Sequence, residues 1–174
     1  MNMIVALCRN RGIGFRNQLP WAFKTDSQYF RDMTIGNGNN AVIMGRKTWW
    51  SLPDAFTPLP KRTNIILSSR TVMQTEKQEN VRVFSHIEDA KWFCHDMKFD
   101  QIWVIGGQSI YRQCIHDRDI KHLYITNIGQ EFLSDTYFPQ YEGEFKLQST
   151  VNTQENGTTL QFQKWGRIAN GDGV

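Results

Sequence analysis

The sequence predicts an α/β fold with a mixed, mostly parallel central sheet, helices on both faces and an antiparallel hairpin at the C-terminal end. Six short segments are β-branched and almost continuously apolar, which is typical of parallel strands buried on both faces. Helix-like stretches separate most of these segments, as in α/β domains. The predicted strands are Met3–Leu7, Ala41–Met44, Thr63–Leu67, Val81–Phe84, Ile102–Ile105 and Leu123–Thr126.

The residues between these strands predict the helices and loops. Glycine, asparagine and proline gather in Gly36–Asn40 and Pro53–Pro60, which indicates loops. The last residues, Ile168–Val174, have the composition of a tail. The predicted helices are Thr25–Met33, Arg46–Ser51, Ile87–Met97 and Gln108–Cys114.

The C-terminal part of the chain changes character and predicts a β-hairpin. Apolar and polar residues alternate in Phe145–Val151 and Thr158–Trp165. Between them lies Glu155-Asn156-Gly157, and the Asn-Gly pair favours a tight turn with positive φ. We therefore expect the last strand to run antiparallel to the rest of the sheet.

Length and composition favour one folded domain spanning residues 1–174. The 174 residues can bury a substantial core, and 40% hydrophobic with 21% charged residues is ordinary for a folded enzyme. The net charge of +3 is small and the basic residues are dispersed. This suits small anionic ligands rather than nucleic acid, and we expect no nucleic-acid partner. We also expect a monomer.

Cysteine spacing and hydropathy exclude several other classes of protein. Cys8, Cys94 and Cys114 are widely separated, without the close pairs of zinc sites or redox dithiols, so we expect reduced core cysteines and no metal. The residues after Met1 do not resemble a secretory signal, and no run of about 18 apolar residues occurs. These features favour a cytoplasmic protein that does not contact a membrane.

Two strand ends carry turns suited to phosphate. Gly45-Arg46-Lys47-Thr48 opens a predicted helix, where free backbone N–H groups, the helix dipole and two cations would attract an anion. A solvated helix start is an equally simple interpretation of that motif. The second turn, Gly106-Gly107-Gln108-Ser109, permits close backbone approach at the carboxyl edge of a sheet, although a plain tight turn would also contain glycines. Together the two turns favour a nucleotide cofactor.

A third polar group follows the strand Thr63–Leu67. Ser68-Ser69-Arg70 offers two hydroxyl groups and a guanidinium, whose planar fork suits the oxygens of a ribose 2′-phosphate. A polar strand end is the alternative interpretation. Because the sequence lacks the GxGxxG fingerprint, an ordinary Rossmann dehydrogenase is disfavoured.

Asp26 is the candidate acid. It lies at the start of a helix whose inward face includes Tyr29, Phe30 and Met33. One interpretation makes Asp26 an N-cap that accepts backbone hydrogen bonds. In the other, Asp26 points into an apolar cleft, where burial would raise its pKa and make a proton available near neutral pH. The residues alone leave both interpretations open.

The order of motifs along nearly the whole chain resembles the dihydrofolate reductase family. The resemblance implies that family's three-layer α/β fold and its reaction, the reduction of dihydrofolate to tetrahydrofolate by hydride from NADPH. The motifs are Ile13-Gly14, Leu19-Pro20-Trp21, Asp26, Phe30, VIMGRKTW (Val42–Trp49), Leu59-Pro60-Lys61-Arg62, NIILSSR (Asn64–Arg70), VIGGQSIY (Val104–Tyr111), LYIT (Leu123–Thr126) and Asp135-Thr136-Tyr137-Phe138-Pro139.

The resemblance implies a role for each substrate-site residue. Asp26 would hydrogen-bond the amino-pyrimidine edge of the pterin and favour its protonation, with Trp21 and Thr126 orienting Asp26 through an ordered water. Tyr111 belongs with this catalytic set, and Arg62 would pair with the α-carboxylate of the glutamyl tail. The same resemblance places Ile4, Val5, Phe30, Leu52, Leu59, Ile105, Tyr111 and Thr126 against the substrate or nicotinamide.

The resemblance also assigns the cofactor residues. Arg46, Lys47 and Thr48 would bind the pyrophosphate and nearby phosphate, and Ser69 with Arg70 the 2′-phosphate. Gly106–Ser109 would approach the diphosphate bridge. Further NADPH contacts are implied for Ala6, Ile13, Gly14, Leu19, Gly45, Leu67, Ser68, Ile105, Gly106, Gly107, Gln108, Ser109, Ile110 and Tyr111.

Two structural features and one class of ligand also follow from the resemblance. We expect a cis peptide bond between Gly106 and Gly107, and a loop over Arg9–Leu19 that closes over the nicotinamide and can limit turnover. Antifolate-type inhibitors are expected to occupy the substrate site.

Three positions depart from the family pattern. Ser27 replaces an apolar or aromatic residue, Lys61 replaces a glycine, and Trp50 stands where smaller or acidic residues are common. These departures affect expectations about substrate affinity and antifolate sensitivity, not the reaction class. Two rival interpretations remain at this point, a related aminopyrimidine reductase of the same fold and a non-catalytic NADP-binding protein.

Overall fold

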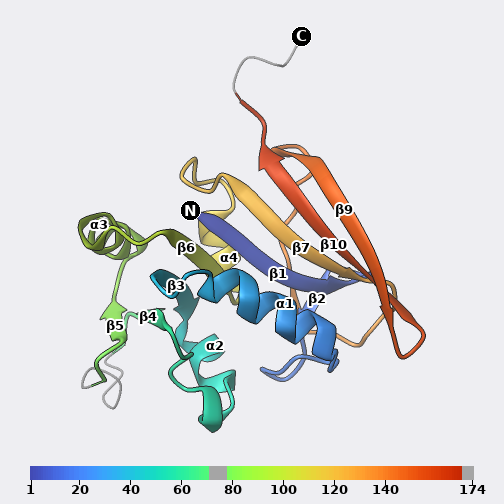
Figure 1. The fold of residues 1–174 in the computed structure, drawn as a ribbon, viewed down its shortest axis with the longest axis horizontal. Coiled ribbons are helices and arrows are strands. Elements are labelled where there is room, and N and C mark those ends of the chain that lie inside the picture. Colours follow the sequence, from blue (N-terminus) through green and yellow to red (C-terminus); the bar gives the residue numbers. More distant parts are fainter. Residues whose placement is uncertain (71–77, 170–174) are drawn as a thin grey trace.

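The predicted strands assemble into one sheet of eight in the computed structural model, which describes residues 1–70 and 78–169. The strand order is β5-β4-β3-β6-β1-β7-β10-β9 (Figure 1). Strands from β5 to β7 pair in parallel, whereas β10 runs antiparallel to both β7 and β9, which confirms the mixed sheet. The strands are β1 Asn2–Cys8, β3 Asn40–Gly45, β4 Arg62–Leu67, β5 Val81–Phe84, β6 Gln101–Gly106, β7 His122–Ile128, β9 Phe145–Glu155 and β10 Thr158–Arg167.

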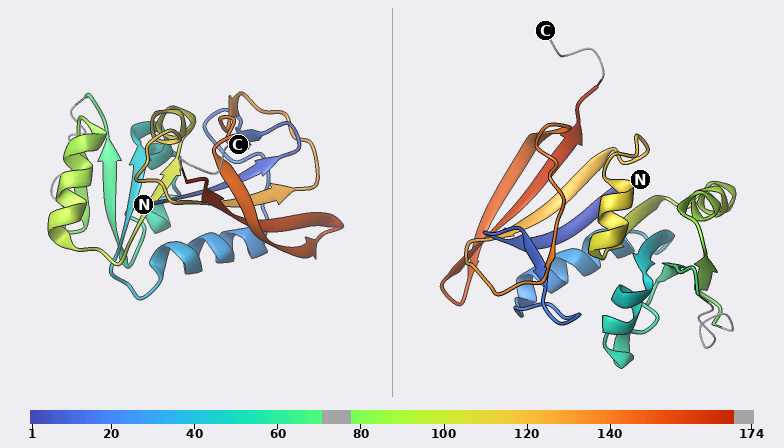
Figure 2. Two further views of the ribbon diagram at one scale, coloured as in Figure 1. Left: turned by 90° about the horizontal axis from the view of Figure 1, so that it is seen from above. Right: turned by 180° about the vertical axis from the view of Figure 1, so that it is seen from behind.

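Helices cover both faces of the sheet, as predicted (Figure 2). Alternate residues of β1 show the two sides: Met3 and Val5 belong to the buried cluster that includes α3 and α4, whereas Ile4 packs in the cluster with α1 and α2. This alternation is the period-2 geometry of a strand buried on both faces. The helices are α1 Lys24–Ile35, α2 Arg46–Ser51, α3 Ile87–Met97 and α4 Gln108–Cys114.

The C-terminal hairpin forms at the predicted turn. Asn156 and Gly157 have φ values of 50° and 76°, and Glu155 pairs with Thr158 across them. Positive φ at both central residues is the geometry that matches strand twist in a two-residue hairpin. Both strands extend beyond the predicted limits, and the longer hairpin reaches the first turn of α1 (Figure 1).

Several short elements differ from the prediction. A second, two-stranded sheet pairs β2, Gly12–Gly14, with β8, Thr136–Tyr137, and the predicted loop Pro53–Pro60 contains a 3-10 helix, η1, over Asp54–Phe56. Asn40 was wrongly assigned to a loop. It begins β3 because its side chain bonds the carbonyl of Thr34 and the backbone N–H of Gln101.

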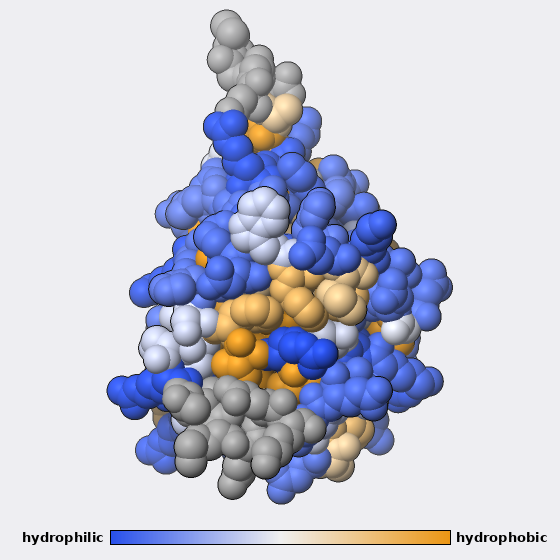
Figure 3. Space-filling view, turned by 90° about the vertical axis from the view of Figure 1, so that its left-hand side faces the viewer, coloured by the Kyte–Doolittle hydropathy of each residue, from blue (hydrophilic) through white to orange (hydrophobic). Residues whose placement is uncertain are grey.

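Figure 3 views the β5 edge of the sheet, where apolar surface lies between α3 and β5 and the rings of Phe84 and Phe93 stand 5.5 Å apart. The three cysteines are buried and free, as expected. In the described ranges no helix is long and apolar enough to cross a bilayer, and no three His, Cys, Asp or Glu side chains converge as metal ligands. Of the predicted tail, only Ile168 and Ala169 lie within the described residues.

Candidate active site

A single large cleft gathers most of the predicted site residues. Its volume is about 1610 Å³, larger than the roughly 300–1,000 Å³ of an ordinary small-molecule pocket. Ile4, Val5 and Ala6 of β1 line it together with Ile105 of β6 and Thr126 of β7, and residues of α1, α2 and α4 surround this apolar floor. The cleft therefore has room for two ligands side by side.

Asp26 lines the cleft from the first turn of α1. The N-cap of this helix is Phe23, which provides no side-chain cap, so the N-cap interpretation of Asp26 is wrong. Burial is the largest influence on the carboxyl group and raises its pKa, since a charge is poorly solvated there. A hydrogen bond from Thr126 lowers the pKa and the charge of Glu155 raises it, and the net direction is upward.

Of the two residues expected to orient the acid, Thr126 lies beside Asp26 and Trp21 is buried in another cluster. Thr126 is 2% exposed and pairs with Ala6 across β7 and β1, which fixes its hydroxyl beside the Asp26 carboxyl. Trp21 is 8% exposed and stacks edge-on against Phe132 with ring centroids 5.4 Å apart. The indole N–H of Trp21 is buried and has no partner among the described residues. A buried donor of this kind needs a hydrogen-bond acceptor.

Tyr111 joins the floor of the cleft to α4. Its side chain is buried, and its hydroxyl donates to the backbone carbonyl of Ile4 at 2.7 Å. Burial raises the pKa of this phenol, so it stays protonated and keeps the bond. The ring lies against Gly106, where an added Cβ would stand 3.0 Å from a ring carbon. Tyr111 is thus a rigid part of the wall.

Arg62 provides a buried cation at the other side of the cleft. The side chain is 5% exposed, donating from Nε to the carbonyl of Pro60 and from Nη1 to the hydroxyl of Thr34, both at 2.9 Å. Burial and the neighbouring charge of Arg31 lower its pKa to about 10, so it remains charged at neutral pH. Arg62 makes no ion pair within the described part of the chain. A buried, unpaired guanidinium suits a carboxylate ligand.

The two glycine turns face each other at the cofactor side. An added Cβ at Gly107 would lie 3.1 Å from the Thr48 hydroxyl, and one at Gly45 would lie 3.0 Å from Ile110. The peptide between Gly106 and Gly107 is cis, which confirms that expectation, and a second cis bond joins Thr57 and Pro58. Because Gly45 and Gly107 have no side chains, the start of α2 can pack closely against the start of α4.

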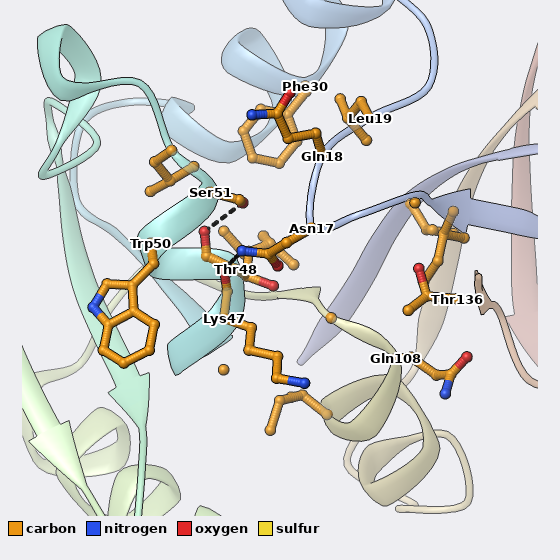
Figure 4. A pocket seen from close by; sticks show the side chains of 18 of the residues that line it. Asn17, Gln18, Leu19, Phe30, Lys47, Thr48, Trp50, Ser51, Gln108 and Thr136 are labelled. Carbon is orange, nitrogen blue, oxygen red and sulfur yellow. Dashed lines mark hydrogen bonds between the residues drawn. The ribbon is translucent and has the colours of Figure 1, made fainter. Parts of the chain in front are cut away.

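Cations and polar groups surround these turns. Lys47 from α2 and Gln108 from the start of α4 approach the same part of the cleft (Figure 4). The guanidinium of Arg46 lies over the indole of Trp50, 4.7 Å from the ring centroid. Neither Arg46 nor Lys47 forms an ion pair in the residues the structure describes, so both charges are available to an anion.

The turn after β4 presents Ser69 and Arg70 to solvent. The hydroxyl of Ser68 bonds the carbonyl of Arg70 at 2.8 Å and accepts from its N–H at 3.2 Å. Ser68 therefore holds the turn together, and both Ser68 and Ser69 line the cleft.

The loop Arg9–Leu19 lies along the cleft and is held from two sides. Arg16 donates its backbone N–H to Asp135, whose own N–H bonds the carbonyl of Gly14, both at 2.9 Å. Asn17 bonds the carbonyl of Lys47 in α2 at 3.1 Å (Figure 4). The loop thus connects the β8 region with the helix predicted to bind phosphate.

Comparison with known proteins identifies the protein family of this chain. Residues 1–167 match the protein family described as Dihydrofolate reductase. The chain belongs to the dihydrofolate reductase family. A Drosophila melanogaster protein named Dihydrofolate reductase is 37% identical over 173 residues, covering 93% of this chain and 94% of the relative. Relatives of the same name from Mus musculus and Aedes albopictus are 37% and 29% identical, with 84% and 96% of this chain and 83% and 97% of the relatives covered.

Membership of the dihydrofolate reductase family confirms the expected class, an NADPH-dependent oxidoreductase. The cleft fits that cofactor. Its glycine turns leave little side-chain bulk where a diphosphate needs close approach, and Arg46 and Lys47 supply charges that no described carboxylate pairs with. Because the family is shown, the rival interpretation as an aminopyrimidine reductase loses its basis.

The structure brings together nearly all residues that the resemblance to dihydrofolate reductases implied. Trp21, Gly106 and Arg70 are exceptions that do not line the cleft: Trp21 is buried in a neighbouring cluster, and Arg70 is exposed at the end of a described segment. Residues that sequence reasoning did not assign to the cleft come mainly from loops and helix faces. They include Tyr29, Arg31, Trp50, Ser51, Pro53, Asp54, Phe56, Pro60, Asp135 and Thr136.

Proposed function

We propose that the chain reduces dihydrofolate to tetrahydrofolate with NADPH, and that the cleft described above is where both molecules bind. The observation that carries this assignment is one cleft containing both a carboxyl group with a raised pKa and two close-packed glycine turns flanked by unpaired cations. NADPH, when bound, supplies the hydride. The side chains supply binding, orientation and a favourable place for a proton.

Asp26 fixes the pterin and favours its protonation. A carboxyl group on an apolar floor can hydrogen-bond the amino-pyrimidine edge of the substrate, and burial keeps its proton available closer to neutral pH. Asp54 and Asp135 also line the cleft, but Asp54 lies in η1 and Asp135 binds the loop at Arg16. Asp26 is therefore the acid for this role.

Trp21 and Thr126 position Asp26. The hydroxyl of Thr126 stands beside the carboxyl and favours its charged form, and the buried indole N–H of Trp21, which has no partner among the described residues, suits a bridging water. Tyr111 connects the floor of the cleft with the Gly106 turn, because its hydroxyl bonds the carbonyl of Ile4 and its ring packs against Gly106. These contacts limit the movement of the acid during the reaction.

Arg62 binds the α-carboxylate of the glutamyl tail. Its guanidinium is held by Pro60 and Thr34 and has no acidic partner in the described chain, so a carboxylate would complete its hydrogen bonding. The apolar residues Phe30, Leu52 and Leu59 line the cleft on the way to it and suit the aromatic body of the substrate.

Different residues bind the different phosphate groups of NADPH. Arg46, Lys47 and Thr48 meet the diphosphate together with the turn Gly106–Ser109, and Ser69 with Arg70 meets the 2′-phosphate. The loop Arg9–Leu19 covers the nicotinamide and excludes water from the reacting atoms. The further NADPH contacts are Ala6, Ile13, Gly14, Leu19, Gly45, Leu67, Ser68, Ile105 and Ile110.

We also propose that residues 1–174 form one domain that acts as a monomer in the cytoplasm, without nucleic-acid or membrane partners. The small net charge of +3 and the dispersed basic residues support the absence of nucleic-acid binding. Antifolate-type inhibitors are expected to compete at the Asp26 side of the cleft.

The test is NADPH oxidation by purified protein with dihydrofolate as substrate. The parent protein is expected to turn over, and Asp26→Asn to lose most of its turnover at neutral pH while still binding NADPH. A parent protein that binds NADPH without oxidising it would support the binding-only alternative and overturn the proposal.

A further inference from the structure

The first turn of α1, which carries Asp26, is capped by a residue from the other end of the chain. Phe23 stands at the N-cap position and has no side-chain group to accept the free N–H groups of the helix. Glu155 accepts instead: its Oε2 takes the N–H of Lys24 and its Oε1 the N–H of Thr25, both at 2.8 Å. The hydroxyl of Thr25 adds a third bond at 2.6 Å.

The hairpin fixes where Glu155 stands. It is the last residue of β9 and pairs with Thr158 across the Asn156-Gly157 turn, so its backbone position follows from the strand register. A second contact docks the same hairpin on α1, because the rings of Tyr29 and Phe162 lie 4.3 Å apart. The hairpin therefore holds the helix at its start and one turn further on.

Charge gives this cap a second effect. The charge of Glu155 acts against ionisation of Asp26, which is the next residue after Thr25. The hydrogen bonds from Thr25 and Lys24 lower the pKa of Glu155, so Glu155 is negatively charged at neutral pH. The other titratable groups in electrostatic contact with this pair are Lys24, facing Glu155, and Tyr29, facing Asp26.

We propose that Glu155 is a positioning residue for the reduction: it sets the place of the Asp26 carboxyl through the first turn of α1, and its carboxylate brings a negative charge to that turn. Glu155 is not among the residues that line the cleft, so both effects are exerted on Asp26 and not on the substrate. The inference rests on the proposed function because it assigns Asp26 its role in the reaction.

Two substitutions and a change of salt concentration separate the two effects. Glu155→Gln removes the charge and one of the two acceptor oxygens, whereas Glu155→Ala removes the charge and both oxygens. For each we would measure kcat/KM for dihydrofolate across pH, at low and at about 1 M salt, where the screening length falls to roughly 3 Å. Glu131→Gln is the matched control, since Glu131 is an exposed carboxylate that does not line the cleft.

The expected result is a shift in pH dependence. With Glu155→Gln, the pH at which kcat/KM declines on the alkaline side should fall by a few tenths of a unit, roughly what an exposed neighbouring charge exerts, and high salt should erase the difference from the parent. Glu155→Ala should show the same shift and also lose about 3- to 10-fold in kcat, because the turn carrying Asp26 is loosened. The KM for NADPH should not change in either variant.

A merely structural cap would alter thermal stability without moving the pH profile, and that result would overturn the proposal. If Glu155→Ala fails to fold, Glu155→Gln alone decides the outcome. Titration of Asp26 by NMR in the NADPH-free protein provides a readout independent of turnover. Its midpoint should fall in Glu155→Gln even if the parent does not reduce dihydrofolate, and an unchanged midpoint would contradict the charge effect.

Discussion

The two ends of the cleft differ in how far their properties depend on distant parts of the chain. At the cofactor end, each strand runs directly into its glycine turn and helix, so four consecutive residues such as Gly45–Thr48 carry the turn, the cations and the hydroxyl. At the substrate end, Asp26 depends on Thr126 and Glu155, which lie 100 or more residues away in the sequence. Phosphate binding is thus a local property here, whereas the acid is a tertiary one.

The largest expected effect is that of replacing Asp26, and it should be confined to the substrate end of the cleft. Asp26→Asn should lower the rate of hydride transfer about 100- to 1,000-fold at neutral pH, because general acid assistance is commonly worth that much. The loss should shrink as the pH falls, since solvent then protonates the substrate. Stopped-flow measurement of NADPH oxidation checks this. A loss below about threefold at neutral pH would remove Asp26 from the chemistry.

Arg62→Lys tests the buried cation at the same end. We expect the KM for dihydrofolate to rise about 10- to 100-fold with kcat largely retained, because a lysine cannot make the bidentate contact of a guanidinium. Steady-state kinetics with dihydrofolate varied at saturating NADPH gives the answer. Lys98→Asn is the control, because Lys98 is exposed, Asn tolerates the φ of 53° at this position and Lys98 does not line the cleft. Equal changes in the two variants would argue against a specific role.

Gly106→Ala disturbs the cofactor end through the backbone. Gly106 has a φ of 116°, which side chains rarely adopt, and the new Cβ would lie 3.0 Å from the ring of Tyr111. We expect a stability loss of about 1–3 kcal/mol and weaker NADPH binding. Urea unfolding and fluorescence titration with NADPH measure both. Parent-like NADPH affinity would show that the turn is not a cofactor site.

The smallest expected effect concerns Trp50. Its ring supports the guanidinium of Arg46, and an exposed cation–π contact contributes about 0.5–1 kcal/mol. Trp50→Ala should therefore raise the KM for NADPH roughly two- to fivefold and leave the KM for dihydrofolate unchanged. Trp50→Phe should restore most of the affinity. An effect on dihydrofolate instead would place Trp50 at the substrate end.

The same contrast explains which elements the sequence could predict. The limits of α2, α3 and α4 agree with prediction, since α2 and α4 follow a strand and a glycine and α3 shows a clear apolar periodicity. The strands β2 and β8 were missed because three and two residues carry no period, and the bonds that hold them join distant segments.

The candidate site shows the same limit. The resemblance to the family implied Asp26, Arg62 and the glycine turns, and the cleft unites them. Whether Asp26 is an N-cap or a cleft acid could not be decided from its neighbours, because the answer depends on Phe23 occupying the N-cap and on Glu155 supplying the cap. No local pattern connects Glu155 with Asp26.

The central claim is that the cleft disfavours the charged form of Asp26, and stability as a function of pH tests it most directly. Because burial raises the folded-state pKa above the ordinary 3.8, the folded protein binds more protons than the unfolded chain between these two values. This contribution to the free energy of unfolding therefore falls as the pH rises through that window. Asn does not ionise, so Asp26→Asn avoids the cost of burying a charged carboxylate. The variant should therefore be more stable than the parent at neutral pH, and the difference should vanish below pH 3.8. A variant that is equally or less stable than the parent at neutral pH, with no pH-dependent difference, would contradict the account.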